Sequence, residues 1–297
     1  MFKVLSIDGG GIRGIFAARF LQRCEESWGE LYKNFDLVTG TSTGGIIALA
    51  AAYEKPMSMI AKLYSDHARD IFRRSSLLSL RTFSLFRSKY DNEALIDMLK
   101  SVFGSGISFD APSVAVRIQS FDLETGVSKI FRAGGPYRDD SHFRVWEVAA
   151  ATSAAPTYFP TFLISSKGLF VDGGVWANNP ALVGVIEALI LHQRLDDMCI
   201  LSVGTGGKIF RDSSVRTGFW SWGSDLVELF FRSQSDGVDQ LAKGLEIKHL
   251  RCYRRISEAL KPNEDALDAT HTTHLLCRLA DERFDREKRE VQRQFFS

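Results

Sequence analysis

The chain has 297 residues, which suits one large domain or two small ones with a sizeable buried core. Hydrophobic residues make up 45% and charged residues 25%, an ordinary composition for a globular protein. The formal net charge of +1 at pH 7 gives no global electrostatic reason to expect a nucleic-acid polymer as partner.

The cysteines and the apolar runs bear on the cellular compartment. Cys24, Cys199, Cys252 and Cys277 are scattered without a CxxC spacing, which favours reduced thiols over a disulfide framework. The apolar start of the chain is too short for a signal peptide. The longest apolar run, residues 46–53, is far below the roughly 18 residues that span a bilayer. We therefore expect a cytoplasmic protein.

The first predicted strand leads into a glycine cluster. Residues 3–7 predict a short buried strand that meets Asp8, and residues 9–11 are all glycine. After Gly14, residues 15–28 place apolar side chains at helical spacing. The pattern predicts a strand, a glycine turn and a helix.

This glycine turn has two possible uses. Unobstructed amides of Gly9, Gly10 and Gly11 can hold an oxyanion, each donor being worth roughly 2.7–4 kcal/mol in a transition state, and Arg13 can add charge. The spacing of Gly9, Gly11 and Gly14 also satisfies the dinucleotide fingerprint G-x-G-x-x-G. That fingerprint needs an acidic residue about 20 positions on, where the sequence instead places another motif. A nucleotide-binding module that uses this loop without hydrolysis remains the alternative function.

That second motif contains a candidate nucleophile. Residues 35–38 predict a strand, residues 40–44 read Gly-Thr-Ser-Thr-Gly and match G-x-S-x-G, and residues 45–53 predict a buried helix without a polar face. In such a sharp strand-to-helix turn the serine hydroxyl is exposed and the helix N-terminus faces developing negative charge. Ser42 is therefore the predicted nucleophile. A serine that merely caps the helix is the alternative.

Later segments continue to alternate between strands and helices. The alternation predicts a three-layer α/β/α fold with a mostly parallel central sheet. We expect residues 1–210 to form the catalytic domain and residues 211–297 to form a helical, charged extension packed on it or continuing it. The later strands are predicted at residues 113–121, 127–131, 168–171 and 198–203, and the helices at 145–152 and 181–191.

A serine nucleophile needs a base, which is usually histidine. Asp172 follows a predicted strand and precedes Gly173 and Gly174, at the edge where catalytic groups of α/β sheets gather. A partly apolar pocket would raise its pKa and make it a better base. A simple Asp-Gly turn is the alternative. The histidines, none in a glycine-flanked strand end, are His67, His142, His192, His249, His271 and His274.

Several of these motifs, in this order, resemble the signatures of the patatin-like phospholipase family. The resemblance covers roughly residues 2–206, about two thirds of the chain. The similar blocks are residues 8–14, 40–44, 151–159, 172–174 and 178–180.

The resemblance implies a dyad without histidine, in which Ser42 attacks and Asp172 is the base. It implies hydrolysis of acyl esters in phospholipids or galactolipids through an acyl-enzyme, with no metal and no other cofactor. The implied oxyanion hole consists of Gly9, Gly10, Gly11 and Arg13.

The compact form also resembles bacterial patatin-like effectors of anti-phage systems, which a cyclic nucleotide activates and which degrade membrane phospholipid. This narrower resemblance implies a cyclic-nucleotide activator and action at the inner membrane surface, and it allows an oligomer. Residues 73–89 mix Leu and Phe with Arg, so they suit either an interfacial lid or, slightly favoured, a helix packed on the core. The aromatic stretch at residues 217–231 suits lipid insertion, a subunit interface or core packing.

Overall fold

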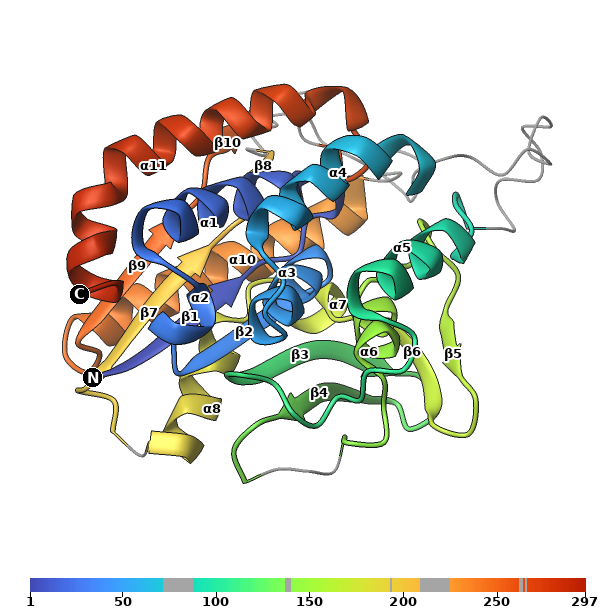
Figure 1. Cartoon of the computed structure of the whole chain (residues 1–297), viewed down its shortest axis with the longest axis horizontal. Helices are drawn as coiled ribbons and strands as arrows, with labels where there is room; N and C mark the ends of the chain where they lie inside the picture. The colour runs from blue at the N-terminus through green and yellow to red at the C-terminus, as the bar shows by residue number, and fades with distance from the viewer. Residues whose placement is uncertain (72–87, 137–139, 193, 209–224, 262–263, 265) are drawn as a thin grey trace.

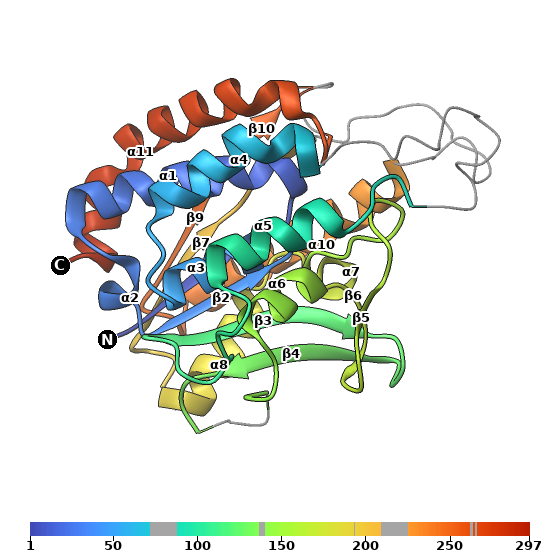
Figure 2. The same cartoon turned by 45° about the vertical axis from the view of Figure 1, so that its right-hand side comes forward.

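A mixed central sheet is covered by helices on both faces (Figures 1 and 2). The computed structural model describes residues 1–71, 88–136, 140–192, 194–208, 225–261, 264 and 266–297. The strand order is β5-β6-β3-β2-β1-β7-β9, and β4 also pairs with β3. The strands are β1 (Phe2–Ile7), β2 (Leu37–Thr41), β3 (Ala115–Asp122), β4 (Val127–Ala133), β5 (Phe162–Ile164), β6 (Gly168–Asp172), β7 (Met198–Val203) and β9 (Cys252–Ile256).

The parallel and antiparallel parts of the sheet are separate. The pairings β1–β2, β1–β7, β2–β3 and β7–β9 are parallel. The pairings of β3 with β4 and β6, and of β5 with β6, are antiparallel and lie together at one side. The predicted α/β fold with a mostly parallel sheet is confirmed. A small second sheet pairs β8 (Gly207–Lys208) with β10 (Ala259–Leu260).

The helices form a layer on each face of the sheet. Alternate side chains of β1 face opposite layers: Leu5 and Ile7 belong to the larger core, and Val4 to the smaller core under α8 and α10. Figure 2 shows α1, α4 and α11 on the larger side and α8 on the other. The helices are α1 (Gly14–Trp28), α2 (Leu31–Asn34), α3 (Thr43–Ala52), α4 (Met57–Ile71), α5 (Glu93–Phe103), α6 (Val145–Thr152), α7 (Gly174–Ala177), α8 (Ala181–His192), α10 (Asp225–Glu246) and α11 (Thr273–Phe295), with short 3₁₀ turns η1 (Gly11–Arg13) and η2 (Thr270–Thr272).

The C-terminal part of the chain contributes to both the sheet and the helical layer. β9 pairs with β7, so it extends the central sheet. α11 lies along α1, where Arg19 and Arg23 both bind Asp281 (2.9 and 2.8 Å) and Phe284 meets the ring of Phe20. The predicted boundary at residue 210 falls outside the described residues, as do residues 73–87 of the basic, apolar segment and residues 217–224 of the aromatic stretch.

The prediction of reduced thiols is wrong for two cysteines. Cys199 of β7 lies opposite Cys252 of β9 in the parallel register, and the two form a disulfide. Cys24 and Cys277 are free. The two cysteines are 53 residues apart in the sequence, and only the sheet makes their strands neighbours. The spacing of the cysteines therefore did not predict this disulfide.

Among the helices of the described residues, none combines the length and the apolar character that a membrane crossing requires.

Candidate active site

The sheet itself brings the candidate nucleophile to the candidate base. β4 covers one edge of β3 along its length, so β2 and β6 must share the other edge. Thr41 ends β2 opposite Gln119, and Asp172 ends β6 opposite the next residue, Ser120. β2 runs parallel to β3 and β6 antiparallel, so their carboxyl ends meet. Ser42, which follows Thr41, is therefore placed beside Asp172.

The turn at Ser42 is tightly held. Ser42 has φ 56° and ψ −127°, a backbone conformation that a non-glycine residue adopts only when its surroundings enforce it. Its amide donates to Thr152 Oγ1 (2.9 Å), which in turn donates to the Gln119 carbonyl (2.5 Å). A Cβ on Gly40 would overlap the Gly44 carbonyl, so glycine is required for this close approach. The strained serine stands at the N-terminus of α3, as the G-x-S-x-G motif predicts.

Asp172 is completely buried, and its environment favours the protonated form. One carboxylate oxygen, Oδ1, accepts a hydrogen bond from the Gly174 amide (2.7 Å). The other, Oδ2, has no partner of ordinary hydrogen-bond geometry among the described residues. Burial raises the pKa of Asp172 to about 7, although hydrogen bonding from the Ser42 hydroxyl and the Gly174 amide opposes the rise. A carboxyl group with this pKa can accept a proton near neutral pH.

The glycine loop after β1 presents two amides. The amide of Gly9 donates to the Asn178 carbonyl (3.0 Å), and the Gly9 carbonyl accepts from Thr205 Oγ1 (2.8 Å). Within the described part of the chain, the amides of Gly10 and Gly11 have no hydrogen-bond acceptor. Gly9 is thus tied to neighbouring loops, whereas Gly10 and Gly11 keep donors for a ligand.

Arg13, which follows the glycines, supports the loop by a hydrogen bond from its side chain to the Gly10 backbone. It is buried in η1, and its Nε donates to the Gly10 carbonyl (3.3 Å). Its Nη1 lies 3.9 Å from Glu228 Oε2. The Ile12 amide donates to the carbonyl of Leu267 (2.9 Å), so a distant part of the chain braces the same turn.

Asp8, just before the loop, is bound by an arginine from β9. Arg255 Nη1 donates to Asp8 Oδ1 (2.7 Å) and to Ser202 Oγ (2.7 Å), and its other Nη binds Asp8 Oδ2. Burial raises the pKa of Asp8, and the Arg255 charge opposes that rise. Sequence reasoning did not find Arg255, which stands in no motif, and it included Thr152 in the family-like block 151–159 without giving it a role.

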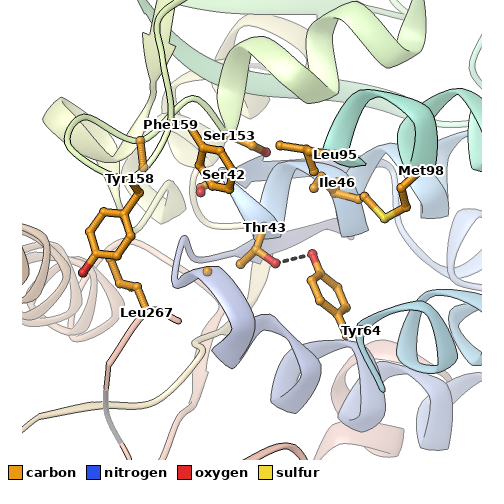
Figure 3. A pocket seen from close by; sticks show the side chains of 12 residues that line it. Ser42, Thr43, Ile46, Tyr64, Leu95, Met98, Ser153, Tyr158, Phe159 and Leu267 are labelled. Carbon is orange, nitrogen blue, oxygen red and sulfur yellow. Dashed lines mark hydrogen bonds between the residues drawn. The ribbon is translucent and has the colours of Figure 1, made fainter. Parts of the chain in front are cut away.

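An apolar pocket opens beside Ser42 (Figure 3). It contains about 560 Å³ of empty space, part of it open to solvent. The hydroxyl groups of Thr43 and Tyr64 are hydrogen-bonded to each other on its wall. Such a wall suits a hydrocarbon chain whose polar end lies at Ser42. The lining residues are Gly11, Ser42, Thr43, Ile46, Tyr64, Leu95, Met98, Ser153, Ala155, Tyr158, Phe159 and Leu267.

Histidine is absent from this lining, among the residues that the structure describes. His192 instead contacts Asp197 (3.2 Å), and the ring of His142 lies tilted against that of Phe143, with 4.2 Å between the ring centroids. The carboxyl group of Asp172, by contrast, is hydrogen-bonded by the Ser42 hydroxyl.

The chain is similar to several known proteins. A family model described as patatin-like phospholipase matches residues 5–185, a range that contains Ser42 and Asp172. A cGAMP-activated phospholipase of Vibrio cholerae is 30% identical, over 90% of this chain and 84% of that protein. Human calcium-independent phospholipase A2-gamma is 29% identical, over 69% of this chain and 28% of that protein. Among solved structures, VipD of Legionella pneumophila has a TM-score of 0.42 and 11% identity, over 93% of this chain and 66% of that one.

Proposed function

Because this chain belongs to the patatin-like phospholipase family, we propose that it hydrolyses acyl esters of phospholipids, with Ser42 as nucleophile and Asp172 as base. The observation that carries the proposal is the meeting of β2 and β6 on one edge of β3, which sets Ser42 beside a buried carboxylate of raised pKa. An apolar pocket beside the same serine supports an acyl chain as the bound group.

Acylation follows from the positions of these groups. Asp172 accepts the Ser42 hydroxyl proton as Oγ forms a bond to the ester carbonyl carbon. The carbonyl oxygen becomes an oxyanion, stabilised by the amides of Gly10 and Gly11 and by the N-terminus of α3. The bond from carbon to the alkyl oxygen then breaks, and the proton on Asp172 passes to that oxygen. In deacylation, Asp172 accepts a proton from water as the water oxygen bonds to the acyl carbon. The bond from that carbon to Ser42 Oγ then breaks, and the proton passes from Asp172 to Oγ.

Aspartate can take the place of histidine as the base because burial raises its pKa and so makes the carboxylate more basic. An unperturbed aspartate has a pKa near ~3.9 and is a weak base. With its pKa raised to about 7, Asp172 is ionised at pH 8 and still basic enough to take the proton.

The direct test measures fatty acid released from phospholipid vesicles by the wild type, Ser42→Ala and Asp172→Asn. We expect release by the wild type alone and labelling of Ser42 by a fluorophosphonate probe. Equal release by wild type and Ser42→Ala would contradict the assignment of the nucleophile. The alternative, a nucleotide-binding module, predicts no probe labelling together with dinucleotide binding that Gly11→Ala abolishes.

We further propose that a cyclic dinucleotide activates the enzyme. The support is the similarity to phospholipases named as cGAMP-activated, in Vibrio cholerae and also in Escherichia coli at 30% identity. A match over 90% of a 297-residue chain must extend past residue 210, so it includes part of the C-terminal region that the family model leaves out. Fatty-acid release measured with and without cGAMP tests this. Full release without any nucleotide would contradict it.

The place of action and the assembly are part of the same proposal. The enzyme would work at the inner surface of the membrane, where its substrate lies, and the activator would act on the C-terminal extension beyond residue 210 or on an oligomer. Co-sedimentation with phospholipid vesicles and light scattering, each with and without cGAMP, test these two points. No sedimentation and no change in mass would contradict them.

A further inference from the structure

Ser153 is a buried hydroxyl group in the apolar pocket beside the nucleophile. The residue is 7% exposed, and its Oγ has no hydrogen-bond partner among the described residues. Ser153 and Ser42 both line this pocket (Figure 3). The Thr43 and Tyr64 hydroxyl groups on the same wall bind each other, whereas an unpartnered polar atom in a mainly apolar pocket is typical of a group that orients a ligand.

The backbone fixes Ser153 relative to both members of the dyad. Its neighbour Thr152 accepts the Gly173 amide at its carbonyl (3.3 Å) and the Ser42 amide at Oγ1 (2.9 Å). Its other neighbour, Ala154, accepts the Asp172 amide at its carbonyl (3.0 Å). Ser153 therefore lies between the two contacts that hold the base, next to the contact that holds the nucleophile.

Of the two oxygens of the scissile ester, only the alkyl oxygen remains as an acceptor for the Ser153 hydroxyl. With the acyl chain in the pocket, the carbonyl oxygen faces the amides of Gly10 and Gly11. The alkyl oxygen must face Asp172, because it receives the proton that Asp172 carries. Ser153 lines the pocket together with Ser42, and its two neighbours hold the backbone at Asp172 and Gly173.

We propose that Ser153 determines specificity for esters of ordinary alcohols, by donating a hydrogen bond from Oγ to the alkyl oxygen that leaves. The inference rests on the proposed function. Ser153 keeps its proton throughout: the bond from carbon to the alkyl oxygen breaks, negative charge develops on that oxygen, and Asp172 returns the proton taken from Ser42. The donated hydrogen bond stabilises the developing charge.

The test compares Ser153→Ala with wild type on two esters of the same fatty acid. One is a glycerolipid, whose alkoxide is a poor leaving group, and the other is the p-nitrophenyl ester, which leaves without help. We expect kcat/KM of Ser153→Ala to fall by about tenfold on the glycerolipid and to stay within about twofold on the p-nitrophenyl ester. Ser153→Thr, which keeps the hydroxyl, should recover most of the loss.

Thermal unfolding separates this role from a structural one. An unpaired buried hydroxyl lowers stability, so Ser153→Ala should raise Tm. Ser6→Ala is the matched control, because Ser6 Oγ in β1 is also buried and unpaired but does not line the pocket. It should raise Tm and leave hydrolysis of both esters unchanged.

Three results would overturn the proposal: an equal loss on both esters, no loss on either ester, or a lower Tm for Ser153→Ala. The proposed function fails differently, since wild type would then hydrolyse neither ester and the fluorophosphonate probe would not label Ser42.

Discussion

Two turns of this protein have the same local sequence and different chemistry. Asp8-Gly9-Gly10 follows β1, and Asp172-Gly173-Gly174 begins at the end of β6. Both aspartates are buried at strand ends. The carboxylate of Asp8 is bound by Arg255. Among the described residues that shift the pKa of Asp172, none is a cation. The first carboxylate is an anchor for the glycine loop, and the second is free to exchange a proton.

The difference shows that a strand-end aspartate takes its role from its neighbours across the sheet. Arg255 comes from β9, which pairs with β7, and β7 lies next to β1. β6 ends instead against the carboxyl end of β2, where Ser42 offers a hydroxyl. The same Asp-Gly-Gly sequence thus anchors the glycine loop in one place and, in the proposed mechanism, supplies the base for Ser42 in the other.

Removing the carboxylate of Asp172, the proposed base, should have the largest effect. Asp172→Asn cannot accept the Ser42 proton, so we expect kcat/KM to fall on the order of 10⁴-fold. The variant should also unfold at a higher temperature than wild type at pH 8, because it lacks a buried charge without a cation. Asp97→Asn is the control, the same change at an exposed residue of α5. Activity within tenfold of wild type in Asp172→Asn would assign the base elsewhere.

Removing Arg255, the cation that binds Asp8, should mainly lower the free energy of unfolding. Arg255→Met leaves the Asp8 charge buried and unpaired, which is expected to cost about 3–5 kcal/mol of unfolding free energy. Urea denaturation measures the loss. Adding Asp8→Asn to Arg255→Met should restore part of the stability, because the orphaned charge is then gone. Equal stability of the single and double variants would show that Asp8 is not charged in the fold.

The loop that Asp8 anchors should tolerate no added side chain at Gly10. A Cβ there would overlap the side chain of Thr205, which is itself bonded to Gly9, so the Gly10 amide must move. We expect Gly10→Ala to lower kcat by about 10²–10³-fold, the usual cost of losing an oxyanion donor. Gly106→Ala, where a Cβ meets nothing within 4 Å, is the control and should be neutral. A fully active Gly10→Ala would place the oxyanion hole elsewhere.

The raised pKa of Asp172 should set the pH dependence. The base must be ionised, so kcat/KM should rise about tenfold per pH unit below pH 7 and become constant above it. Over the same pH range the contribution of Asp172 to the free energy of unfolding falls while kcat/KM rises. The folded state binds a proton between about pH 4 and pH 7 that the unfolded state has lost, so this group lowers stability as pH rises through that window. A pH–rate profile levelling off near pH 4 would contradict the raised pKa.

Several features of the protein follow from the sequence alone. Glycines around Ser42 and a strand on one side with a helix on the other predict a sharp strand-to-helix turn, which the structure contains at Thr41–Thr43. The helix at residues 145–152 and the strand at residues 198–203 are confirmed at those bounds. Turn chemistry and periodicity are properties of near neighbours along the chain, so a sequence expresses them directly.

The tertiary structure alone decided which of these local features act together. The hydrogen bond from Ser42 to Thr152 spans 110 residues, and the ion pair between Asp8 and Arg255 spans 247. The disulfide of Cys199 and Cys252 likewise depends on two strands becoming neighbours. Whether a buried aspartate is an anchor or a base depends on the desolvation and on the cation that the sheet brings to it, and neither is a property of the residues beside it in the chain.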